Sequence, residues 1–489
     1  MKYLEGLEPK KVFEFFEYIS SVPRGSGNTK AVSDLCVKFA KERGLDVYQD
    51  SLNNVIIRKP ATTGYEAAPV VVLQGHLDMV CAKTDTCTKD MATEPIDLIH
   101  DEKYVYAKDT TLGGDDGIAV AYALAILDSD DIKHPALEAV FTIDEETGMD
   151  GASGIDANEI KGRILLNIDS EEEGIFTCGC AGGCRVNGEI PVFFKKPQRN
   201  GGYYKITLTG LKGGHSGTEI HKQPASANYL IGRVLYELYD KSEFNLVYLN
   251  GGMFDNVISG TAEAVVFYED HILIPIDAVI GKIEAELKSE YGYINPELTL
   301  SCIETEPCDL GISYDVLDKK STESVINVIY LSHQGVIETD PELKGMIRTS
   351  QNLGIIDLKE DNFCISFLVR SSINAQKESA VNKNTKLIHL FGGSVSYTGN
   401  YPGWKYEPDS KLRELCVKTY KEQYGTDPVV TTIHAGLECG IFADKLKGLD
   451  AISVGPNILD IHTPRERLDI ASVERVWKFV LRVLESFKP

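Results

Sequence analysis

Histidines and carboxylates recur in this chain at the points where runs of aliphatic residues end. His76 and Asp78 directly follow the apolar run Val70–Gln74. Because they are two positions apart, their side chains point the same way if the chain stays extended. Asp115 and Asp116 lie between glycines, ahead of another apolar stretch. Taken singly, the first pattern could be a polar pair at a strand end, which is the less favoured interpretation, and the second could simply be a helix N-cap.

Three further junctions of the same kind follow along the chain. Glu145 and Glu146 come directly after the run Leu137–Ile143, Asp169 closes a short aliphatic run, and His462 lies in a loop near the C-terminus. Acidic residues next to buried strands are costly to pack unless something positive lies beside them. A solvated loop explains the Glu145–Glu146 junction alone about as well as a functional site does, and the Asp169 and His462 junctions, each taken alone, favour a structural role.

Together, the junctions supply two histidines and several carboxylates, and no cysteine is required. Imidazole nitrogen and carboxylate oxygen are ligands that suit zinc, manganese and cobalt. In a site with two ions, one carboxylate must bridge them, because dications about 3.5–4 Å apart repel each other unless an anion lies between them. A bridging water or hydroxide has a pKa near about 7, and an adjacent carboxylate can act as its general base. The set therefore predicts a two-metal hydrolytic site.

The elements that must position these residues alternate between strands and helices. Asn54–Arg58, Val70–Gln74 and Leu137–Ile143 predict strands, and Asp115–Asp128 predicts a helix. Almost purely aliphatic strands suit a sheet that is covered on both faces, and functional residues belong at the carboxyl ends of such strands. We therefore expect an α/β, three-layer catalytic domain with a mostly parallel central sheet.

The middle of the chain has a different texture. A polar stretch rich in turn residues, 195–202, precedes a strand, a helix at His221–Tyr239 and further strands and helices. The order resembles a ferredoxin-like β-α-β-β-α-β plan that occurs roughly twice. Turn residues return at 401–404, and the remaining elements predict a return to the first domain. The expected domains are a catalytic domain formed by 1–190 and 405–489, and an α+β lid domain at 191–404.

Composition excludes several classes of function. The 489 residues include 73 acids and 50 bases, a net charge of −23, which disfavours binding to nucleic acid or to anionic lipid. A membrane span is not expected, because no run of about 18 apolar residues occurs. The N-terminal residues show no apolar core with a cleavage site, so no secretory signal is expected. The eleven cysteines then favour reduced thiols and a cytoplasmic location.

A series of motifs identifies a family. They occur in the order GHLDM, TTLGGDDGIAVAYALAIL, DEETGMDGA, NIDSEEEG, GLKGGHSG and HAGLECG. Together they closely resemble the aminoacyl-histidine dipeptidases (Xaa-His dipeptidases, peptidase D). These belong to the two-zinc exopeptidase group that includes carnosinases, peptidase T and aminoacylases. The resemblance runs from about Leu7 to Leu484, and GLKGGHSG and HAGLECG are specific to the dipeptidase branch.

The resemblance implies a set of ligands for two divalent metal ions, zinc first, with manganese or cobalt as alternatives. The corresponding residues are His76, Asp115, Glu146, Asp169 and His462. Asp115 would bridge the ions. His76 and Asp169 would hold one ion, and Glu146 and His462 the other.

Three residues correspond to catalytic groups of the family. Asp78 matches the acid that orients His76, an outer-shell role that fixes the tautomer of a ligand imidazole. Glu145 matches the general base. His215, in the glycine-rich GLKGGHSG, matches a lid histidine that stabilises the tetrahedral oxyanion.

The resemblance also implies substrate contacts. Arg370 matches an arginine that pairs with the substrate carboxylate, a partner that suits the guanidinium fork. Further contacts are expected from the lid and from HAGLECG, namely Asn256, His434, Gly436 and Glu438. The chain departs from the family at Asp116, where relatives usually carry asparagine, and after Asn256, where a lid arginine is missing. The first departure could alter metal preference, and the second puts strict Xaa-His specificity in doubt.

The implied function is metal-dependent hydrolysis of dipeptides with a free C-terminus. The substrates would be of the Xaa-His type, such as β-alanyl-His, attacked by a metal-bridged hydroxide with Glu145 as general base. Two alternatives stay open: a broader-specificity dipeptidase or aminoacylase of the same group, and a non-catalytic peptide-binding protein that has kept the metal fold. The expected partner is a small peptide, not nucleic acid or a membrane, and a homodimer remains open.

Overall fold

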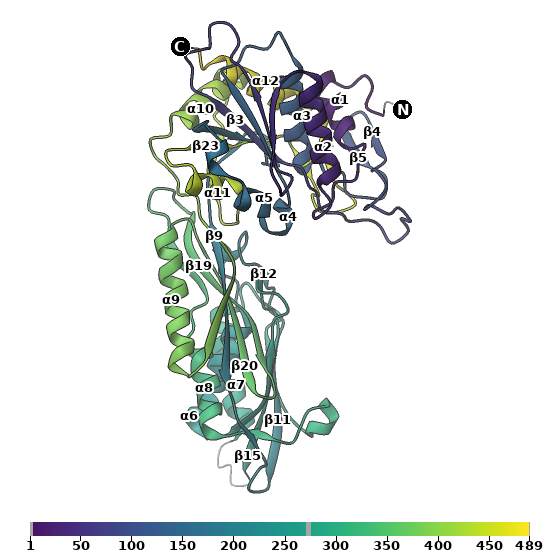
Figure 1. Cartoon of the computed structure of the whole chain (residues 1–489). Coiled ribbons are helices and arrows are strands. Elements are labelled where there is room, and N and C mark those ends of the chain that lie inside the picture. The colour runs from purple at the N-terminus through teal and green to yellow at the C-terminus, as the bar shows by residue number, and fades with distance from the viewer. Residues whose placement is uncertain (1–2, 270–274, 489) are drawn as a thin grey trace. The chain divides into compact units, whose positions relative to one another are not determined.

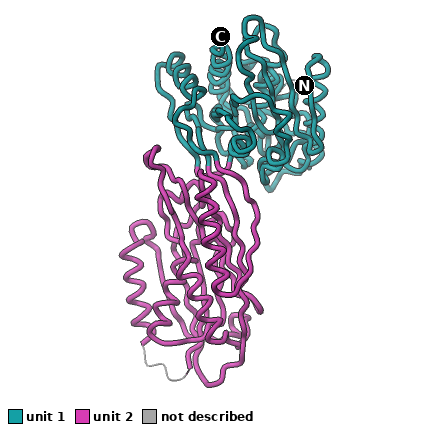
Figure 2. Tube along the Cα trace, turned by 60° about the vertical axis from the view of Figure 1, so that its left-hand side comes forward, with its two compact units in different colours: residues 1–180, 404–433, 437–489 teal, residues 181–403, 434–436 magenta. Residues whose placement is uncertain are grey.

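A computed structural model describes residues 3–269 and 275–488, which form two units (Figure 2). Unit 1 comprises residues 1–180, 404–433 and 437–489, and unit 2 comprises 181–403 and 434–436. The expected boundary after residue 190 is displaced, because β9 (Gly182–Pro191) pairs over its whole length with β20 (Asn362–Ser371) of unit 2. The division therefore falls before β9.

The main sheet of unit 1 is mostly parallel. Strands β6, β3, β7 and β23 run parallel to one another, β1 and β2 are antiparallel at one edge, and β22 pairs in parallel with β8 at the other. In spatial order the strands are β1 (Asp46–Gln49), β2 (Val55–Lys59), β6 (Leu137–Thr142), β3 (Val71–His76), β7 (Ile164–Asn167), β23 (Asp450–Ser453), β8 (Ile175–Cys180) and β22 (Val429–Ile433).

Helices and a small second sheet complete unit 1. The helices are α1 (Lys10–Ile19), α2 (Lys30–Glu42), α3 (Gly114–Asp128), α4 (Glu145–Gly148), α5 (Asp150–Gly154), α10 (Lys411–Tyr424), α11 (Glu438–Lys445) and α12 (Ile470–Glu485). The second sheet has the order β24 (Ile458–Leu459), β25 (Arg467–Asp469), β5 (Tyr104–Ala107) and β4 (Leu98–His100).

Helix α3 lies in the centre of the core of unit 1. Every residue from Gly114 to Leu127 is buried, which explains why this stretch is apolar on all sides. Tyr122 stacks on Trp477 of α12 with ring centroids 5.8 Å apart and donates a hydrogen bond to the Val473 carbonyl at 2.8 Å. Figure 1 shows α1, α2 and α3 to the right of the main sheet and α11 to its left. The sheet is covered on both faces, so the expected α/β class is confirmed.

Unit 2 is built on one long antiparallel sheet with helices α6 (Ala227–Lys241), α7 (Ile276–Tyr291), α8 (Lys319–Tyr330) and α9 (Asn374–Leu390). Its spatial order is β16 (Thr299–Thr305), β11 (Gly201–Thr209), β15 (Ala262–Glu269), β13 (Asn245–Gly251), β19 (Ile347–Leu358), β20, β9 and β21 (Ser394–Tyr401), with β18 (Gly335–Thr339) on β19. Two short ribbons pair β10 (Phe194–Lys195) with β17 (Val316–Leu317), and β12 (Gly214–His215) with β14 (Val257–Ile258).

The doubled ferredoxin-like pattern is confirmed, but the two copies are not in tandem. One copy is β11-α6-β13-β15-α7-β16. The other begins with β9, which precedes the first copy in the chain, and continues as α8-β19-β20-α9-β21. Pairing of β13 with β19, with Asn250 opposite Asp357, joins both copies into one sheet. The expected helix at His221–Tyr239 begins only at Ala227, because Pro224 disfavours helical backbone before it.

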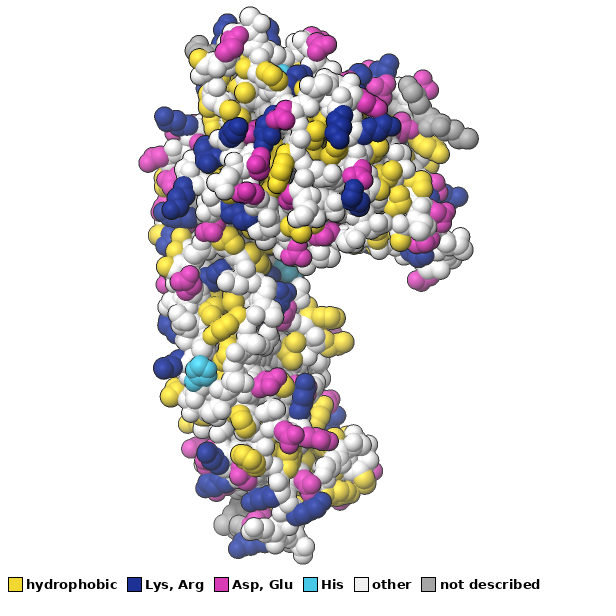
Figure 3. Space-filling model, in the orientation of Figure 1, with side chains coloured by type: hydrophobic (Ala, Val, Ile, Leu, Met, Phe, Trp, Pro, Cys, Tyr) yellow, Lys and Arg dark blue, Asp and Glu magenta, His cyan; other side chains and the backbone are white. Residues whose placement is uncertain are grey.

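The surface and the thiols of the described residues can be compared with the composition. On the face drawn in Figure 3, lysines and arginines are scattered among acidic side chains. Among the residues that the structure describes, no helix combines the length and apolar character needed to cross a bilayer. All eleven cysteines are free, and burial raises the pKa of Cys178 to about 12 and that of Cys180 to about 11. These two thiols therefore stay neutral.

Candidate active site

The expected metal ligands come together at the carboxyl end of the parallel strands of unit 1. His76 ends β3, Glu146 lies at the start of α4 directly after β6, and Asp169 follows β7. Strand register aligns these ends, since His76 lies opposite Thr142 of β6, and Gln74 opposite Asn167 of β7. The start of α3 adds Asp115, and the loop between β24 and β25 adds His462.

Asp115 lies between the two histidines. Its Oδ1 is 3.1 Å from His76 Nε2, and its Oδ2 is 3.2 Å from His462 Nε2. Each histidine also faces a second carboxylate: His76 Nε2 is 3.4 Å from Asp169 Oδ1, and His462 Nε2 is 3.0 Å from Glu146 Oε2. The donor atoms thus form two groups that share one carboxylate.

These two groups fit a pair of divalent ions. Ligands bound tetrahedrally at about 2.0–2.2 Å from zinc lie about 3.3–3.6 Å from one another, close to the 3.0–3.4 Å observed here. In addition, Glu146 Oε1 is buried without a hydrogen-bond partner among the described residues. An orphan carboxylate oxygen of this kind is costly unless a cation or donor meets it.

The electrostatics of the cluster also favour cations. Burial opposes charge at His76, but carboxylates, Asp169 first, outweigh it and raise the pKa of His76 well above its usual value. Hydrogen bonds to Asp115 and Glu146 raise the pKa of His462 to about 10. Burial raises the pKa of Asp169 to about 7, whereas the two histidines lower that of Asp115 against the effect of burial. Without metal, protons supply the positive charge that the acids require.

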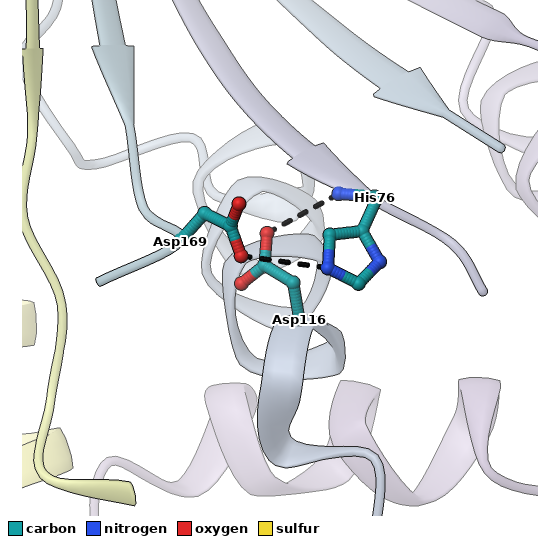
Figure 4. Close-up of side chains that lie close together, drawn as sticks. All are labelled: His76, Asp116 and Asp169. Carbon is teal, nitrogen blue, oxygen red and sulfur yellow. Dashed lines mark hydrogen bonds and ion pairs between the residues drawn. The ribbon is translucent and has the colours of Figure 1, made fainter. Parts of the chain in front are cut away.

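Asp116, the second acid of the GGDDG motif, lies beside His76 (Figure 4). Its Oδ2 accepts a hydrogen bond from the backbone N–H of His76 at 3.2 Å, and its Oδ1 is buried without a partner among the described residues. Burial, then the charge of Asp169, raises the pKa of Asp116 well above its usual value. Ligand atoms of His76, Asp116 and Asp169 lie within 4.8 Å of one another, so Asp116 is a further acid facing this half of the site.

Asp78 connects His76 to the two glutamates. His76 Nδ1 lies 3.1 Å from the backbone oxygen of Asp78 and 3.4 Å from its Oδ1. The carboxylate also accepts hydrogen bonds from the backbone N–H groups of Glu145 at 3.1 Å and Glu146 at 3.4 Å, and from the Ser26 hydroxyl at 2.8 Å. Asp78 therefore holds the start of α4 as well as the imidazole.

Glu145 is a further acid whose charge interacts with this cluster. Burial raises the pKa of Glu145 well above its usual value, and the charges of Asp169, Glu438 and Asp115 add to this effect. A carboxyl group with a raised pKa is a group that can take up a proton near neutral pH.

Glu438, an expected substrate contact, has a buried carboxylate. It is fully buried at the start of α11, and its Oε2 accepts hydrogen bonds from Gln74 Nε2 at 2.6 Å and from Thr142 Oγ1 at 2.7 Å. Its Oε1 has no partner among the described residues. Gln74 and Thr142 were not expected to take part. The signal for Gln74 was a polar residue in an otherwise aliphatic strand.

In unit 2, His215 ends β12, and Asn256 directly precedes β14, the strand with which β12 pairs. The Asn256 carbonyl accepts a hydrogen bond from the Ser216 backbone N–H at 2.9 Å. The Thr218 backbone N–H donates to His215 Nδ1 at 3.2 Å, so the neutral ring carries its proton on Nε2. Burial, then the charge of Arg370, lowers the pKa of His215, which favours this neutral form.

Arg370 and His434 form the second group in unit 2. Arg370 is 6% exposed and donates to the Tyr401 hydroxyl at 3.2 Å, and no ion pair joins it to an acid among the described residues. His434 Nε2 lies 2.7 Å from Ser350 Oγ, and burial, then Arg370, lowers the pKa of His434 to about 3. Gly436 lies in the same segment, 434–436. A buried guanidinium without an acid partner is a site for an anion.

Comparison with known proteins gives consistent matches. The model of Peptidase family M20/M25/M40 matches residues 72–486. The chain is 35% identical over 486 residues to the cytosol non-specific dipeptidase of Escherichia coli (strain K12), covering 99% of both proteins. The crystal structure of aminoacylhistidine dipeptidase from Vibrio alginolyticus superimposes with a TM-score of 0.93 at 35% identity, covering 99% of this chain and 98% of that one. Aminopeptidase PepT from Bacillus cereus ATCC 10987 shares the fold, with a TM-score of 0.57 at 15% identity, covering 99% of this chain and 100% of that one.

Proposed function

The chain belongs to peptidase family M20/M25/M40 and is a metallo-dipeptidase. We propose that it hydrolyses dipeptides that have a free C-terminus and are of the Xaa-His type. One observation carries the proposal: the two oxygens of Asp115 each face the Nε2 of a different histidine, at 3.1 and 3.2 Å. A single carboxylate between two imidazoles is the arrangement that a pair of bridged ions requires.

Two divalent ions would be held by the two groups of donors that share Asp115. His76 and Asp169 belong to one group, and Glu146 and His462 to the other. Nitrogen and oxygen donors without sulfur suit zinc, and also manganese or cobalt. When bound, such ions polarise a carbonyl group and lower the pKa of water.

Glu145 is the proposed general base. A carboxylate beside the reacting centre takes a proton from the attacking water and returns it to the amine that leaves. The backbone N–H of Glu145 donates a hydrogen bond to Asp78 Oδ1 at 3.1 Å, and this bond fixes the position of the proposed base. Its raised pKa brings proton uptake closer to neutral pH.

His215 is proposed to stabilise the oxyanion as a neutral donor. Because Thr218 donates to Nδ1, the Nε2–H of the neutral ring is free to donate a hydrogen bond to an oxygen that becomes negative. The lowered pKa of His215 keeps the ring in this form near neutral pH.

The two ends of a dipeptide are proposed to meet partners of opposite charge. Arg370, buried and without an acid partner among the described residues, suits the C-terminal carboxylate. Glu438, with one buried oxygen free of protein partners in the described part of the chain, suits the N-terminal ammonium group. Asn256, His434 and Gly436 remain proposed contacts of the side chains or backbone of the substrate.

A broader dipeptide specificity is the second candidate. The two relatives that are each 35% identical carry names that differ on this point, one non-specific and one for aminoacyl-histidine. The missing arginine after Asn256 favours the broader reading. A cytoplasmic location is also proposed, from the eleven free cysteines and from the cytosolic name of one relative.

The test is a dipeptide profile of metal-reconstituted enzyme. Chelated protein, with zinc or manganese added back, is assayed on β-alanyl-His, Gly-His, Leu-Gly and an N-acetyl amino acid. Preference for the two histidine peptides supports the proposal, and equal rates on Leu-Gly support the broader dipeptidase. Hydrolysis of only the N-acetyl amino acid, or no metal-dependent turnover at all, contradicts it.

A further inference from the structure

Two buried charged residues of unit 1 have no role in the mechanism above. Arg24 lies between α1 and α2, and Glu466 lies four positions after His462. Each is only 2% exposed. We propose that Arg24 and Glu466 are positioning residues that hold three ligand-bearing loops, 76–79, 112–115 and 460–466, in the arrangement that binds metal. This inference rests on the proposed metal site.

Arg24 ties the first loop to the second. Its Nη1 donates hydrogen bonds to the backbone oxygens of Leu77 at 3.0 Å and Asp78 at 3.2 Å. Its Nη2 donates to the backbone oxygen of Gly113. Leu77 and Asp78 directly follow His76, and Gly113 lies two positions before Asp115. One guanidinium therefore sets the separation of the two segments.

The chain around Arg24 is itself fixed to the first loop. The Met79 backbone N–H donates to the Arg24 carbonyl at 3.1 Å, and Gly25 forms a parallel bridge with Met79. The Ser26 hydroxyl donates to the Asp78 carboxylate at 2.8 Å. Arg24 therefore acts from a segment that cannot shift without the loop.

Glu466 ties the second loop to the third. Its Oε2 accepts hydrogen bonds from the backbone N–H groups of Leu112 at 2.8 Å and Gly113 at 2.9 Å. Its Oε1 accepts from Gly114 at 2.7 Å and from Asp115 at 3.3 Å. One carboxylate thus satisfies the free N–H groups at the start of α3 and links them to the loop that carries His462.

The glycines of the GGDDG motif leave room for this arrangement. A Cβ on Gly113 would lie 2.4 Å from Arg24 Nη2, and one on Gly117 would lie 2.5 Å from the same atom. A Cβ on Gly114 would lie 3.2 Å from Glu466 Oε1. Gly113 also has a φ of +65°, which favours glycine. The motif is therefore explained by the close approach of the two positioning residues as well as by Asp115.

The charges also match the role. Arg24 interacts electrostatically with Glu466, Asp78, Asp116 and Asp115. The hydrogen bonds of its guanidinium that the structure describes go to backbone oxygens and not to the side-chain atoms proposed to bind metal. Removing one member of a buried charged group leaves the others uncompensated, so the effect of a substitution should reach the ligands.

The test compares Glu466→Gln with Glu138→Gln. Glu138 is also 2% exposed in unit 1, and accepts backbone hydrogen bonds from Lys161 at 2.9 Å and Gly162 at 2.8 Å, away from the metal donors. Affinity for zinc or manganese alone is measured by competition with a chelating dye, together with the melting temperature of the metal-free protein. Glu466→Gln is expected to weaken metal binding by about 10–100-fold, the usual loss for outer-shell positions, and Glu138→Gln to leave it near wild type.

A second pair of variants covers the case in which Glu466→Gln fails to fold. Arg24→Lys keeps the charge but loses the fork, and is compared with Arg413→Lys, where the guanidinium donates to the carbonyls of Glu407 and Pro408. Weakened metal binding in Arg24→Lys alone, with kcat lowered and KM little changed at saturating metal, supports the proposal. Wild-type metal affinity in folded Arg24 and Glu466 variants overturns it. A wild-type protein that binds metal but cleaves no dipeptide contradicts only the proposed function, since the affinities still decide the positioning role.

Discussion

Asp78 offers a quantitative test of how the outer residues act on the reaction. Its carboxylate accepts hydrogen bonds from the Glu145 N–H at 3.1 Å, the Glu146 N–H at 3.4 Å and the Ser26 hydroxyl at 2.8 Å. The His76 Nδ1 atom is closer to the backbone oxygen of Asp78, at 3.1 Å, than to its carboxylate, at 3.4 Å. The carboxylate should therefore act more on Glu145, the proposed general base, than on the imidazole of His76, a proposed ligand.

Asp78→Asn keeps the shape of the side chain and removes its charge. The amide oxygen can still accept from Glu145 or Glu146, but the amide nitrogen then meets the other N–H as a second donor. Losing one hydrogen bond to a charged group costs about 1.5–3 kcal/mol. Since about 1.4 kcal/mol is a factor of ten in rate, kcat is expected to fall by about 10–100-fold if this loss displaces Glu145. Metal content should change less, because the backbone contact to His76 is retained.

The matched control is Asp450→Asn. The Asp450 carboxylate accepts hydrogen bonds from the Ser410 hydroxyl at 2.5 Å and from the backbone N–H of Leu412 at 2.9 Å. Asp450 lies at the start of β23, at the opposite end of the strand from the proposed metal ligands. Both variants are assayed for kcat and KM on a dipeptide at saturating metal, for bound metal and for melting temperature. The reasoning is refuted if Asp78→Asn keeps wild-type kcat, or if it loses activity only in proportion to lost metal.

Three further predictions follow from the site. Glu145→Gln should bind metal as the wild type does and lose nearly all turnover, because an amide cannot take up the proton; comparable activity at equal metal content contradicts this. The pKa of His434 is lowered to about 3 in the folded protein. Below about pH 6.5, His434 therefore binds a proton in the unfolded chain but stays neutral in the folded protein. Neutral His434 therefore contributes stability above about pH 6.5, and this stability is lost as the pH falls towards 3, by about 1.4 kcal/mol per pH unit. The melting temperature of His434→Gln should fall less steeply than that of the wild type between about pH 6.5 and about 5.5. Identical slopes of melting temperature against pH refute this. Arg370→Met should raise KM for dipeptides by about 10–100-fold, whereas Tyr401→Phe, which removes only the partner of Arg370 Nη1, should change KM little; equal effects would show that the guanidinium does not bind the carboxylate.

Much of the end of unit 1 that carries the proposed ligands could be predicted from the sequence. His76, Glu146 and Asp169 each follow a short aliphatic run, and parallel strands bring their carboxyl ends to the same edge. Hydrophobic period and strand length were enough to place them, with bounds wrong by only one or two residues. The glycine turn ahead of an apolar helix drew attention to Asp115 and Asp116, but only the family resemblance singled out Asp115.

Other features depend on contacts that local sequence does not contain. β9 belongs to the second ferredoxin-like copy because it pairs with β20 and β21, which lie far along the chain. Arg24 has no periodic pattern around it, and its importance appears only when three backbone oxygens surround its guanidinium. Burial of Glu438 likewise depends on Gln74 and Thr142, which come from two other strands.

The residues proposed to bind metal and several of those proposed to contact the substrate belong to different units of this chain. The proposed metal donors and Glu145 all belong to unit 1, whereas His215, Asn256 and Arg370 belong to unit 2. A substitution in unit 2 can therefore change which peptides are cleaved and leave metal affinity as it is. Overall identity does not decide the preference, because two relatives at the same 35% carry names of different specificity. We expect selectivity to depend on the residues that contact the substrate, and the loop after Asn256 is the first place to look for them.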